Sequence, residues 1–205
     1  MLYPLKPMNA QIGSISYSID PADEIVAVGD DWDRFAIDNG APRELLSDRI
    51  MHRSFWEFVS GETVEHVYRV LLAKVRGGAS LAFNFRCDSP ALRRFLTLRM
   101  YPVGTGGIEF ITETVRTEER EFEALFDTTG RKADGLILAC SWCNKVKTAP
   151  LVWLEAEEAV RVLGLFENNA RPSLSHGMCG ACYLAVTEKR KLPRRLSKTR
   201  LSKTK

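Results

Sequence analysis

Four of the five cysteines of this chain form two C-x-x-C pairs, Cys140 with Cys143 and Cys179 with Cys182. In structural zinc sites four cysteine sulfurs complete the tetrahedron that Zn²⁺ prefers and leave no position for water. The paired spacing therefore predicts one structural zinc site rather than unconnected thiols or disulfides. Four thiolates suit iron as well, so the sequence leaves zinc and iron open.

The residues around the two pairs indicate how the ligands are positioned. An apolar run, "LILA", precedes Cys140 and predicts a strand, and a helix-compatible run follows Cys179. A helix that begins at the second pair places its positive end beside the thiolates, which lowers their pKa. His176 stands three residues before Cys179, close enough to be an alternative ligand. Because four cysteines are available, we expect His176 to act as a second-shell residue that orients a ligand.

Catalytic patterns find little support in the sequence. The chain contains three histidines and has no phosphate-binding loop, no G-x-S-x-G elbow and no kinase or cyclase phrase. We therefore expect no enzyme activity and assign no catalytic residues.

The charge of the chain is unevenly distributed. Residues 188–205 carry nine Lys or Arg against one Glu, whereas residues 1–187 have a formal net charge of about −5. The 188–205 segment has no apolar periodicity, which predicts a disordered basic tail. Such a tail can contact a phosphate backbone, but it has no aromatic residue to stack on bases. Weak nucleic-acid binding and a purely solvated tail both remain open.

The compartment follows from the thiols and from the apolar runs. No run is long enough for a membrane-spanning helix, and residues 1–12 show no signal-peptide pattern. Cysteine pairs that bind metal are typical of a reducing compartment. We expect a cytoplasmic protein without membrane contact.

Hydrophobic periodicity predicts the elements of the first half of the chain. Ile15, Tyr17 and Ile19 alternate with polar residues and lead through "DPADE" into "IVAV", which is a hairpin pattern. A single apolar stripe at helical spacing between Ser60 and Gly77 predicts a long helix. Three alternating runs, "SLAFNF", "FLTLRMY" and "GIEFITE", predict strands. Together these elements predict an α+β fold, with an antiparallel sheet and helices on one face.

The order of these elements resembles a known family. The phrases "SYSIDPADEIVAVGDDWDRFAIDNG" and "RSFWEFV", then the long helix and three strands, resemble a PAS domain over residues 13–116. The resemblance implies a sensory module that binds a small molecule, flavin, haem or a protein partner. The segment "DRIMHRSFWEFV" lacks the reactive cysteine of light-sensing flavin domains. Haem would need a histidine that points into the pocket, but His66 faces away from the apolar stripe. The cofactor-binding residues are therefore unknown.

If the PAS-like part contains a pocket, the resemblance places it between two strands and two helical segments. The strands contain Phe83 and Leu98, and the helical segments lie around Trp32 and Phe55. A packed core without a ligand is the alternative, because aromatic residues at this spacing also fill ordinary cores.

Residues 136–187 resemble a recurrent bacterial element found at the end of PAS-containing signalling proteins. The match comprises Cys140, Cys143, Lys145, Trp153, Glu155, Ser175, His176, Gly177, Cys179 and Cys182. It implies a small zinc-knuckle or treble-clef-like element with four cysteine ligands. Asn144 and the run "TAPLV" depart from the usual pattern in the loop between the ligand pairs.

The sequence thus predicts five segments. Residues 1–12 form an extension, 13–116 the PAS-like domain, 117–135 a helical or flexible linker, 136–187 the metal-binding element and 188–205 the tail. The charged run of the linker, with Phe122, Leu125 and Phe126 among its apolar positions, predicts a connecting helix. Such a helix either pairs with a second copy in a homodimer or docks on the sheet of its own domain. We expect each of the two folded parts to have its own core.

The expected function is cytoplasmic signal transduction, as a sensor or an adaptor that binds a small ligand or a protein partner of a signalling pathway. Two alternatives stay open at this point. One is a transcription-linked regulator that binds nucleic acid through the zinc element and the basic tail. The other is a redox switch in which the thiolates lose zinc on oxidation.

Overall fold

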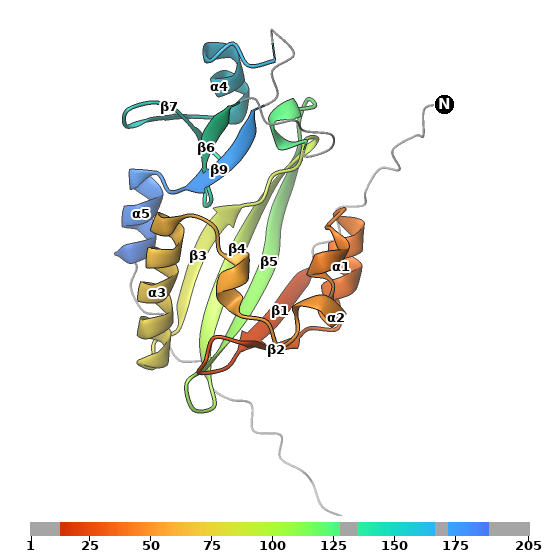
Figure 1. The fold of residues 1–205 in the computed structure, drawn as a ribbon, viewed down its shortest axis with the longest axis vertical. Helices are drawn as coiled ribbons and strands as arrows, with labels where there is room; N and C mark the ends of the chain where they lie inside the picture. Colours follow the sequence, from red (N-terminus) through yellow and green to blue (C-terminus); the bar gives the residue numbers. More distant parts are fainter. Residues whose placement is uncertain (1–12, 128–134, 167–171, 189–205) are drawn as a thin grey trace, which may run out of the picture.

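The computed structural model describes residues 13–127, 135–166 and 172–188 (Figure 1). The larger sheet has the order β2-β1-β5-β4-β3, and all its neighbouring strands are antiparallel. Its strands are β1 (Ser14–Ile19), β2 (Ile25–Val28), β3 (Leu81–Arg86), β4 (Leu92–Val103) and β5 (Gly107–Glu119). The expected hairpin, the three later strands and the α+β class with an antiparallel sheet are confirmed.

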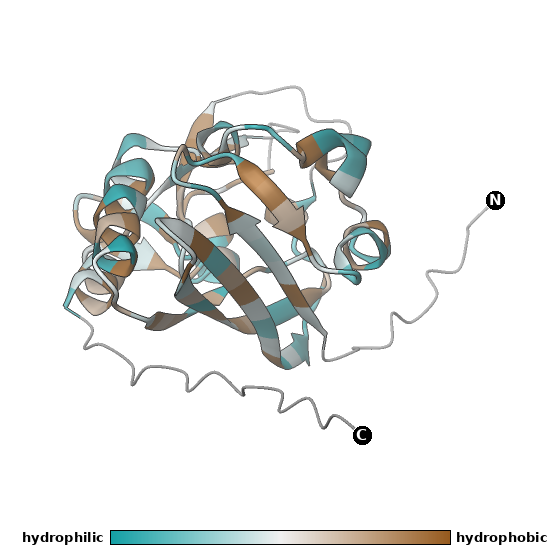
Figure 2. Ribbon diagram, turned by 90° about the horizontal axis from the view of Figure 1, so that it is seen from below, coloured by the Kyte–Doolittle hydropathy of each residue, from teal (hydrophilic) through white to brown (hydrophobic). Residues whose placement is uncertain are grey.

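One face of this sheet is apolar because of the period-two alternation in the strands. Phe83 of β3 pairs with Leu98 of β4, and Met100 pairs with Phe110 of β5, so these side chains share a face. All four are buried. Figure 2 shows the strands banded brown and teal along their length. The alternation therefore fixes which side of the sheet receives the helices.

Helix α3 (Glu62–Arg76) is the helix predicted from the apolar stripe. Val64, Val67, Leu71, Leu72 and Val75 are buried, and Gly77 follows its last turn, as expected. Their i, i+3, i+4 spacing places them on the side that packs on the sheet. Among the described residues, no helix is both long enough and apolar enough to cross a membrane.

Short helical segments between β2 and α3 complete the cover of the sheet. They are α1 (Trp32–Asp38), η1 (Arg43–Leu45), α2 (Ser47–Ile50) and η2 (Phe55–Phe58). The Trp32 indole donates to the Leu45 carbonyl at 2.8 Å, and Asp33 accepts hydrogen bonds from both the backbone and the hydroxyl of Ser47. These bonds hold the segments together although each is short.

A second sheet carries the cysteines. It has the order β8-β7-β6-β9, and the β6–β9 pair is parallel. Its strands are β6 (Leu136–Cys140), β7 (Val146–Ala149), β8 (Val152–Leu154) and β9 (Ser173–Gly177), with helices α4 (Ala156–Val162) and α5 (Gly180–Thr187). Helix α5 lies beside α3 (Figure 1).

The expected connecting helix in the linker is wrong for the residues that the structure describes. Strand β5 continues to Glu119, because its pairing with β4 extends as far as Leu92. One 3-10 turn follows, η3 (Ala124–Phe126), and it buries Leu125 against Val146 and Ala156. The flexible stretch expected after it falls on residues 128–134, outside the described residues. The predicted extension 1–12 and nearly all of the basic tail, 189–205, also lie outside them.

The expectation of two separate cores is met only in part. A second buried cluster does exist, with Val146, Ala156 and Ala159 of the second element and Leu125. The cysteines, however, are not in it. One buried cluster contains Val67 and Phe83 of the larger sheet and its helix together with Cys140, Trp142 and Cys179. The reason is the length of the Trp142 side chain, which reaches out of the cysteine loop to Tyr68 and Phe83. The cysteine loop is therefore packed against the larger sheet as part of its core, while β7 and α4 pack in the second cluster.

Candidate metal centre and adjoining cavity

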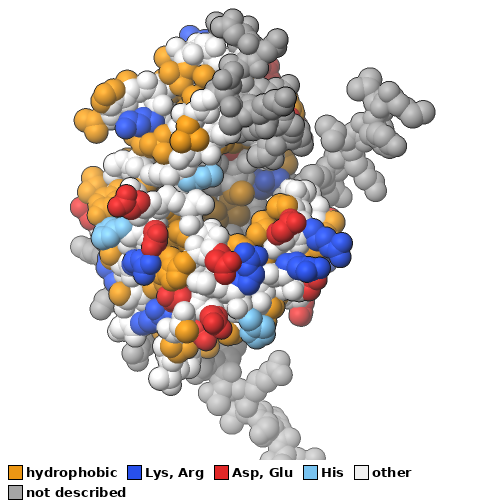
Figure 3. Space-filling view, in the orientation of Figure 1, with side chains coloured by type: hydrophobic (Ala, Val, Ile, Leu, Met, Phe, Trp, Pro, Cys, Tyr) orange, Lys and Arg blue, Asp and Glu red, His pale blue; other side chains and the backbone are white. Residues whose placement is uncertain are grey.

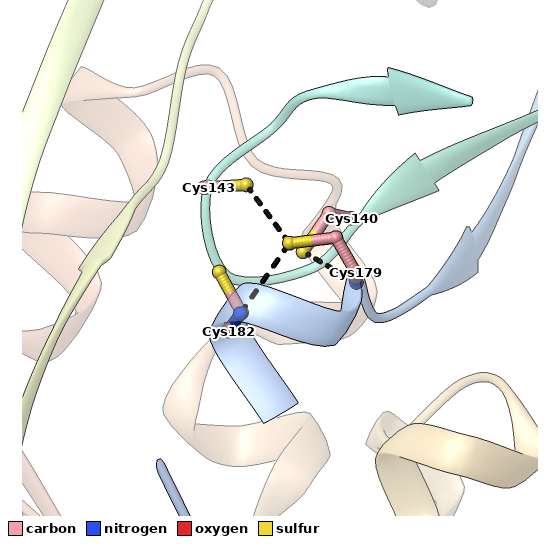
Figure 4. Close-up of side chains that lie close together, drawn as sticks. All are labelled: Cys140, Cys143, Cys179 and Cys182. Carbon is pink, nitrogen blue, oxygen red and sulfur yellow. Dashed lines mark hydrogen bonds between the residues drawn. The ribbon is translucent and has the colours of Figure 1, made fainter. Parts of the chain in front are cut away.

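The four predicted ligands lie together in space. Their sulfur atoms are all within 4.8 Å of one another, and the Sγ atoms of Cys143 and Cys179 are 3.8 Å apart (Figure 4). Sulfurs bound to one zinc at about 2.3 Å in a tetrahedron lie roughly 3.8 Å from each other. The residues present fit a metal with four thiolate ligands.

The first pair of ligands is positioned by a tight turn at the end of β6. The backbone N–H of Cys140 donates to the Lys145 carbonyl at 2.8 Å, and the N–H of Asn144 donates to the Cys140 carbonyl at 2.9 Å. Asn144 has a φ of 57°, in the left-handed region that Asn tolerates better than most residues. Asn144, which departs from the pattern that the element resembles, thus suits the backbone of the turn.

The second pair stands at the start of α5, as the sequence indicated. Cys179 is the N-cap residue of α5, and its sulfur accepts a hydrogen bond from the N–H of Cys182 at 3.4 Å. The N–H of Cys179 in turn donates to the Cys140 sulfur at 3.3 Å. Backbone donors and the positive end of a helix favour negative charge on these sulfurs.

The thiols share their protons unequally. The pKa of Cys140 is lowered far below its usual range, because Cys143 and Cys182 donate hydrogen bonds to its sulfur. The pKa of Cys143 is raised to about 12, chiefly because its proton is held in the hydrogen bond to Cys140, and the pKa of Cys182 is raised for the same reason. A bound metal ion would take the place of these protons, since the thiolate is the form of cysteine that binds metal.

His176 does not belong to this group of ligand atoms. It lies in β9, is exposed and lines a cavity next to the cysteine element. Four cysteines form the group without it. The structure thus gives no support to His176 as an alternative ligand, and its second-shell role stays a prediction.

A cavity of about 480 Å³ adjoins the cysteine loop. It is lined by Phe83, Leu98, Trp32 and Phe55, so the conditional prediction of its place is confirmed. Figure 3 shows a recess with hydrophobic side chains in its floor between the upper part of the molecule and the short helices. The sequence did not indicate that the second element supplies part of the wall, through Ser141, Trp142 and His176.

Sequence reasoning also missed an ion-pair network that joins the two parts. Arg86 donates to Glu155 at 2.7 Å, and Arg120 lies 2.8 Å from Glu157. Both arginines pair with Asp88, whose side chain is fully buried. Glu155 belongs to the motif that resembles the bacterial element, and this motif is the one signal in the sequence that singles out Glu155. Its partner is 69 residues away in the chain, so no local pattern reveals the pair.

Comparison with protein-family models and with curated proteins found no match to this sequence. The geometry of the centre and of the cavity therefore carries the functional argument.

Proposed function

We propose that this chain is a cytoplasmic PAS-type sensor or adaptor with a structural zinc centre. The observation that carries the proposal is the aromatic cavity of about 480 Å³, a size typical of small-molecule sites, under the helices of the larger sheet. The order of the elements, hairpin, short helices, long helix and three strands, supports the PAS-type assignment. Its five strands close into one antiparallel sheet with the hairpin next to the last strand.

The zinc centre has a structural role in this proposal. A bound ion would hold the turn after β6 and the start of α5 in one position. Two of the four cysteines, Cys140 and Cys179, are buried, and four thiolates leave no open coordination position for a water nucleophile. The proposed activity is therefore binding, without catalysis, and its output passes to a protein partner.

Metal analysis and native mass spectrometry of the full-length protein from its own host test the proposal. The expected result is one zinc per chain, no visible colour and a small molecule retained by a fraction of the protein. Cys140→Ser should lose the zinc, whereas Cys87→Ser, at the remaining cysteine, should retain it. A metal-free protein with an ordered 136–187 segment would contradict the zinc centre. A red protein that contains iron would show that the centre binds iron instead of zinc.

A further inference from the structure

Trp142 belongs to both candidate sites. In the sequence it stands between the ligands Cys140 and Cys143. In space its ring centroid lies 5.6 Å from that of Tyr68 and 5.6 Å from that of Phe83, and all three rings line the cavity. The residue is only 4% exposed. A change in the metal loop therefore moves the wall of the cavity directly.

The backbone around Trp142 is held from both sides. The Trp142 carbonyl accepts a hydrogen bond from the N–H of Arg86 in β3 at 2.7 Å, and the N–H of Ser141 donates to the Gly177 carbonyl in β9 at 2.9 Å. The indole N–H, however, is buried without a hydrogen-bond partner among the described residues. A buried N–H without a hydrogen bond costs free energy and does not hold the ring in place. The position of the ring therefore depends on the packing of neighbouring side chains and on the cysteine loop.

The lining of the cavity indicates the chemistry of its ligand. Eight Phe, Tyr and Trp side chains line it, together with the exposed His176. Among the described residues, no Asp, Glu, Lys or Arg side chain does so. Tyrosine hydroxyls are neutral at pH 7 even at their ordinary pKa, and burial raises the pKa of Tyr17 and raises that of Tyr68 to about 12. Apart from His176, no titratable cation or carboxylate of the lining could offset the hydration that a charged ligand would lose. An uncharged, mostly aromatic molecule suits this surface.

We infer that the cavity binds an uncharged aromatic small molecule and that this binding is coupled to metal occupancy of the cysteine centre through Trp142. The inference rests on the proposed function, which it deepens by naming the ligand class and its regulation. Cys140 and Cys143 would each bind the metal, so a bound ion would fix the two ends of the Cys140–Cys143 loop and hence the ring between them. Loss of the metal frees the loop, enlarges and disorders the wall, and weakens ligand binding. By thermodynamic linkage the ligand then strengthens metal binding by the same factor.

A matched pair of fluorescent probes tests the ligand class on the full-length, zinc-loaded protein. N-phenyl-1-naphthylamine is uncharged, and 8-anilinonaphthalene-1-sulfonate has the same aromatic skeleton with a negative charge. The uncharged probe should bind at one site per chain, with a Kd at least about tenfold lower than that of the charged probe. Equal affinity for the two probes would overturn the assignment of an uncharged ligand.

Removal of zinc with a chelator tests the coupling. The Kd of N-phenyl-1-naphthylamine should rise about fivefold or more, the lower end of typical coupling between sites. In Trp142→Phe the ratio of the Kd without zinc to the Kd with zinc should shrink to less than about twofold. In Trp153→Phe, at a tryptophan of the same element that does not line the cavity, the ratio should persist.

The outcomes separate the coupling from the proposed function. An unchanged Kd after zinc removal overturns the coupling and leaves the sensor role standing. Absence of probe binding to the zinc-loaded protein overturns the inferred ligand class and the coupling, and it leaves only the adaptor role of the proposed function. If the metal-free chain loses its far-ultraviolet circular dichroism, Co²⁺ is put in place of zinc and its visible absorption is recorded. Saturating N-phenyl-1-naphthylamine should shift that absorption, and an unchanged spectrum would overturn the coupling.

Discussion

Gly61 and His176 touch through their backbones. A Cβ atom built on Gly61 would lie 2.4 Å from the carbonyl oxygen of His176. Gly61 is the residue before α3 and has a φ of 93°, whereas His176 lies in β9, three residues before the predicted ligand Cys179. The start of the longest described helix therefore packs directly on the strand that leads into the candidate metal centre.

Gly61→Ala should separate these two elements. The new methyl group combines the strain of a positive φ with overpacking against a backbone atom, so the free energy of unfolding should fall by about 3 kcal/mol or more. Gly104→Ala is the matched control, because Gly104 also has a positive φ but has no atom within 4 Å of its built Cβ. We expect that change to cost about 1–2 kcal/mol. Urea unfolding of both variants measures the difference, and equal costs would contradict the contact.

Cys140→Ser should loosen the larger sheet as well as the cysteine element, because Cys140 and Phe83 belong to one buried cluster. With free zinc at a thousand times its Kd, loss of metal binding removes about 4 kcal/mol of stability. Hydrogen exchange should become faster in β3 and α3 of this variant and stay unchanged in Cys87→Ser. Exchange that becomes faster only in residues 136–187 would show that the two parts are independent after all.

Asp88→Asn should be among the most damaging polar changes in the protein. The Asp88 carboxylate is fully buried and pairs with Arg86 and Arg120, whose side chains are 12% and 3% exposed. Removing its charge takes away one of the two carboxylate partners of each arginine; Arg86 keeps Glu155, and Arg120 keeps Glu157. The loss of two buried charge-assisted pairs should cost about 2–3 kcal/mol. Glu118→Gln breaks the surface pair with Arg116 and should cost less than about 1 kcal/mol. Thermal unfolding of the two variants in one buffer provides the comparison.

Tyr68→Phe should make the protein more resistant to alkali. The pKa of Tyr68 is about 12 in the folded state, because burial disfavours the charged phenolate, against 10.0 for the exposed side chain. The folded state keeps the proton that the unfolded chain releases, so stability is intact below pH 10 and is lost as the pH rises toward 12. At pH 11 this loss is about 1 kcal/mol.

The phenylalanine variant lacks that proton and should avoid the loss, while the ring packing against Phe55 and Trp142 is retained. The measurement is the difference in unfolding free energy between variant and wild type at pH 8 and at pH 11. A difference that is the same at both pH values would contradict the raised pKa.

Local patterns predicted the local elements. The apolar stripe from Val64 to Val75 predicted α3, and the spacing of Cys140, Cys143, Cys179 and Cys182 predicted which thiols gather. The linker helix failed because Phe122 and Leu125 have helical spacing, yet the strand pairing that extends β5 is formed with residues of β4. Sequence spacing does not contain such a partner.

The packing of the cysteine loop against the larger sheet was not predicted, for a similar reason. Trp142 reads as a filler of the cysteine turn, and only the packing shows that its ring reaches Phe83. Arg86 and Glu155 are each ordinary charged residues in the sequence, and their pairing across 69 positions depends on the whole fold. Interactions of this kind are set by tertiary packing rather than by periodicity.

The paired strands β6 and β9 are synthesised at different times, so the cysteine element cannot be completed until late in protein synthesis. Residues 141–172 separate the two strands, and the register pairs Cys140 with Gly177. A ribosome therefore releases the complete larger sheet and the first cysteine pair well before the strand and helix that carry the second pair. In that interval the chain exposes the apolar surface that Trp142 and Val186 later share. A nascent chain arrested before residue 172 should therefore bind chaperones and be cleaved by proteases. Release from both should coincide with synthesis of the second cysteine pair, which completes the candidate metal centre.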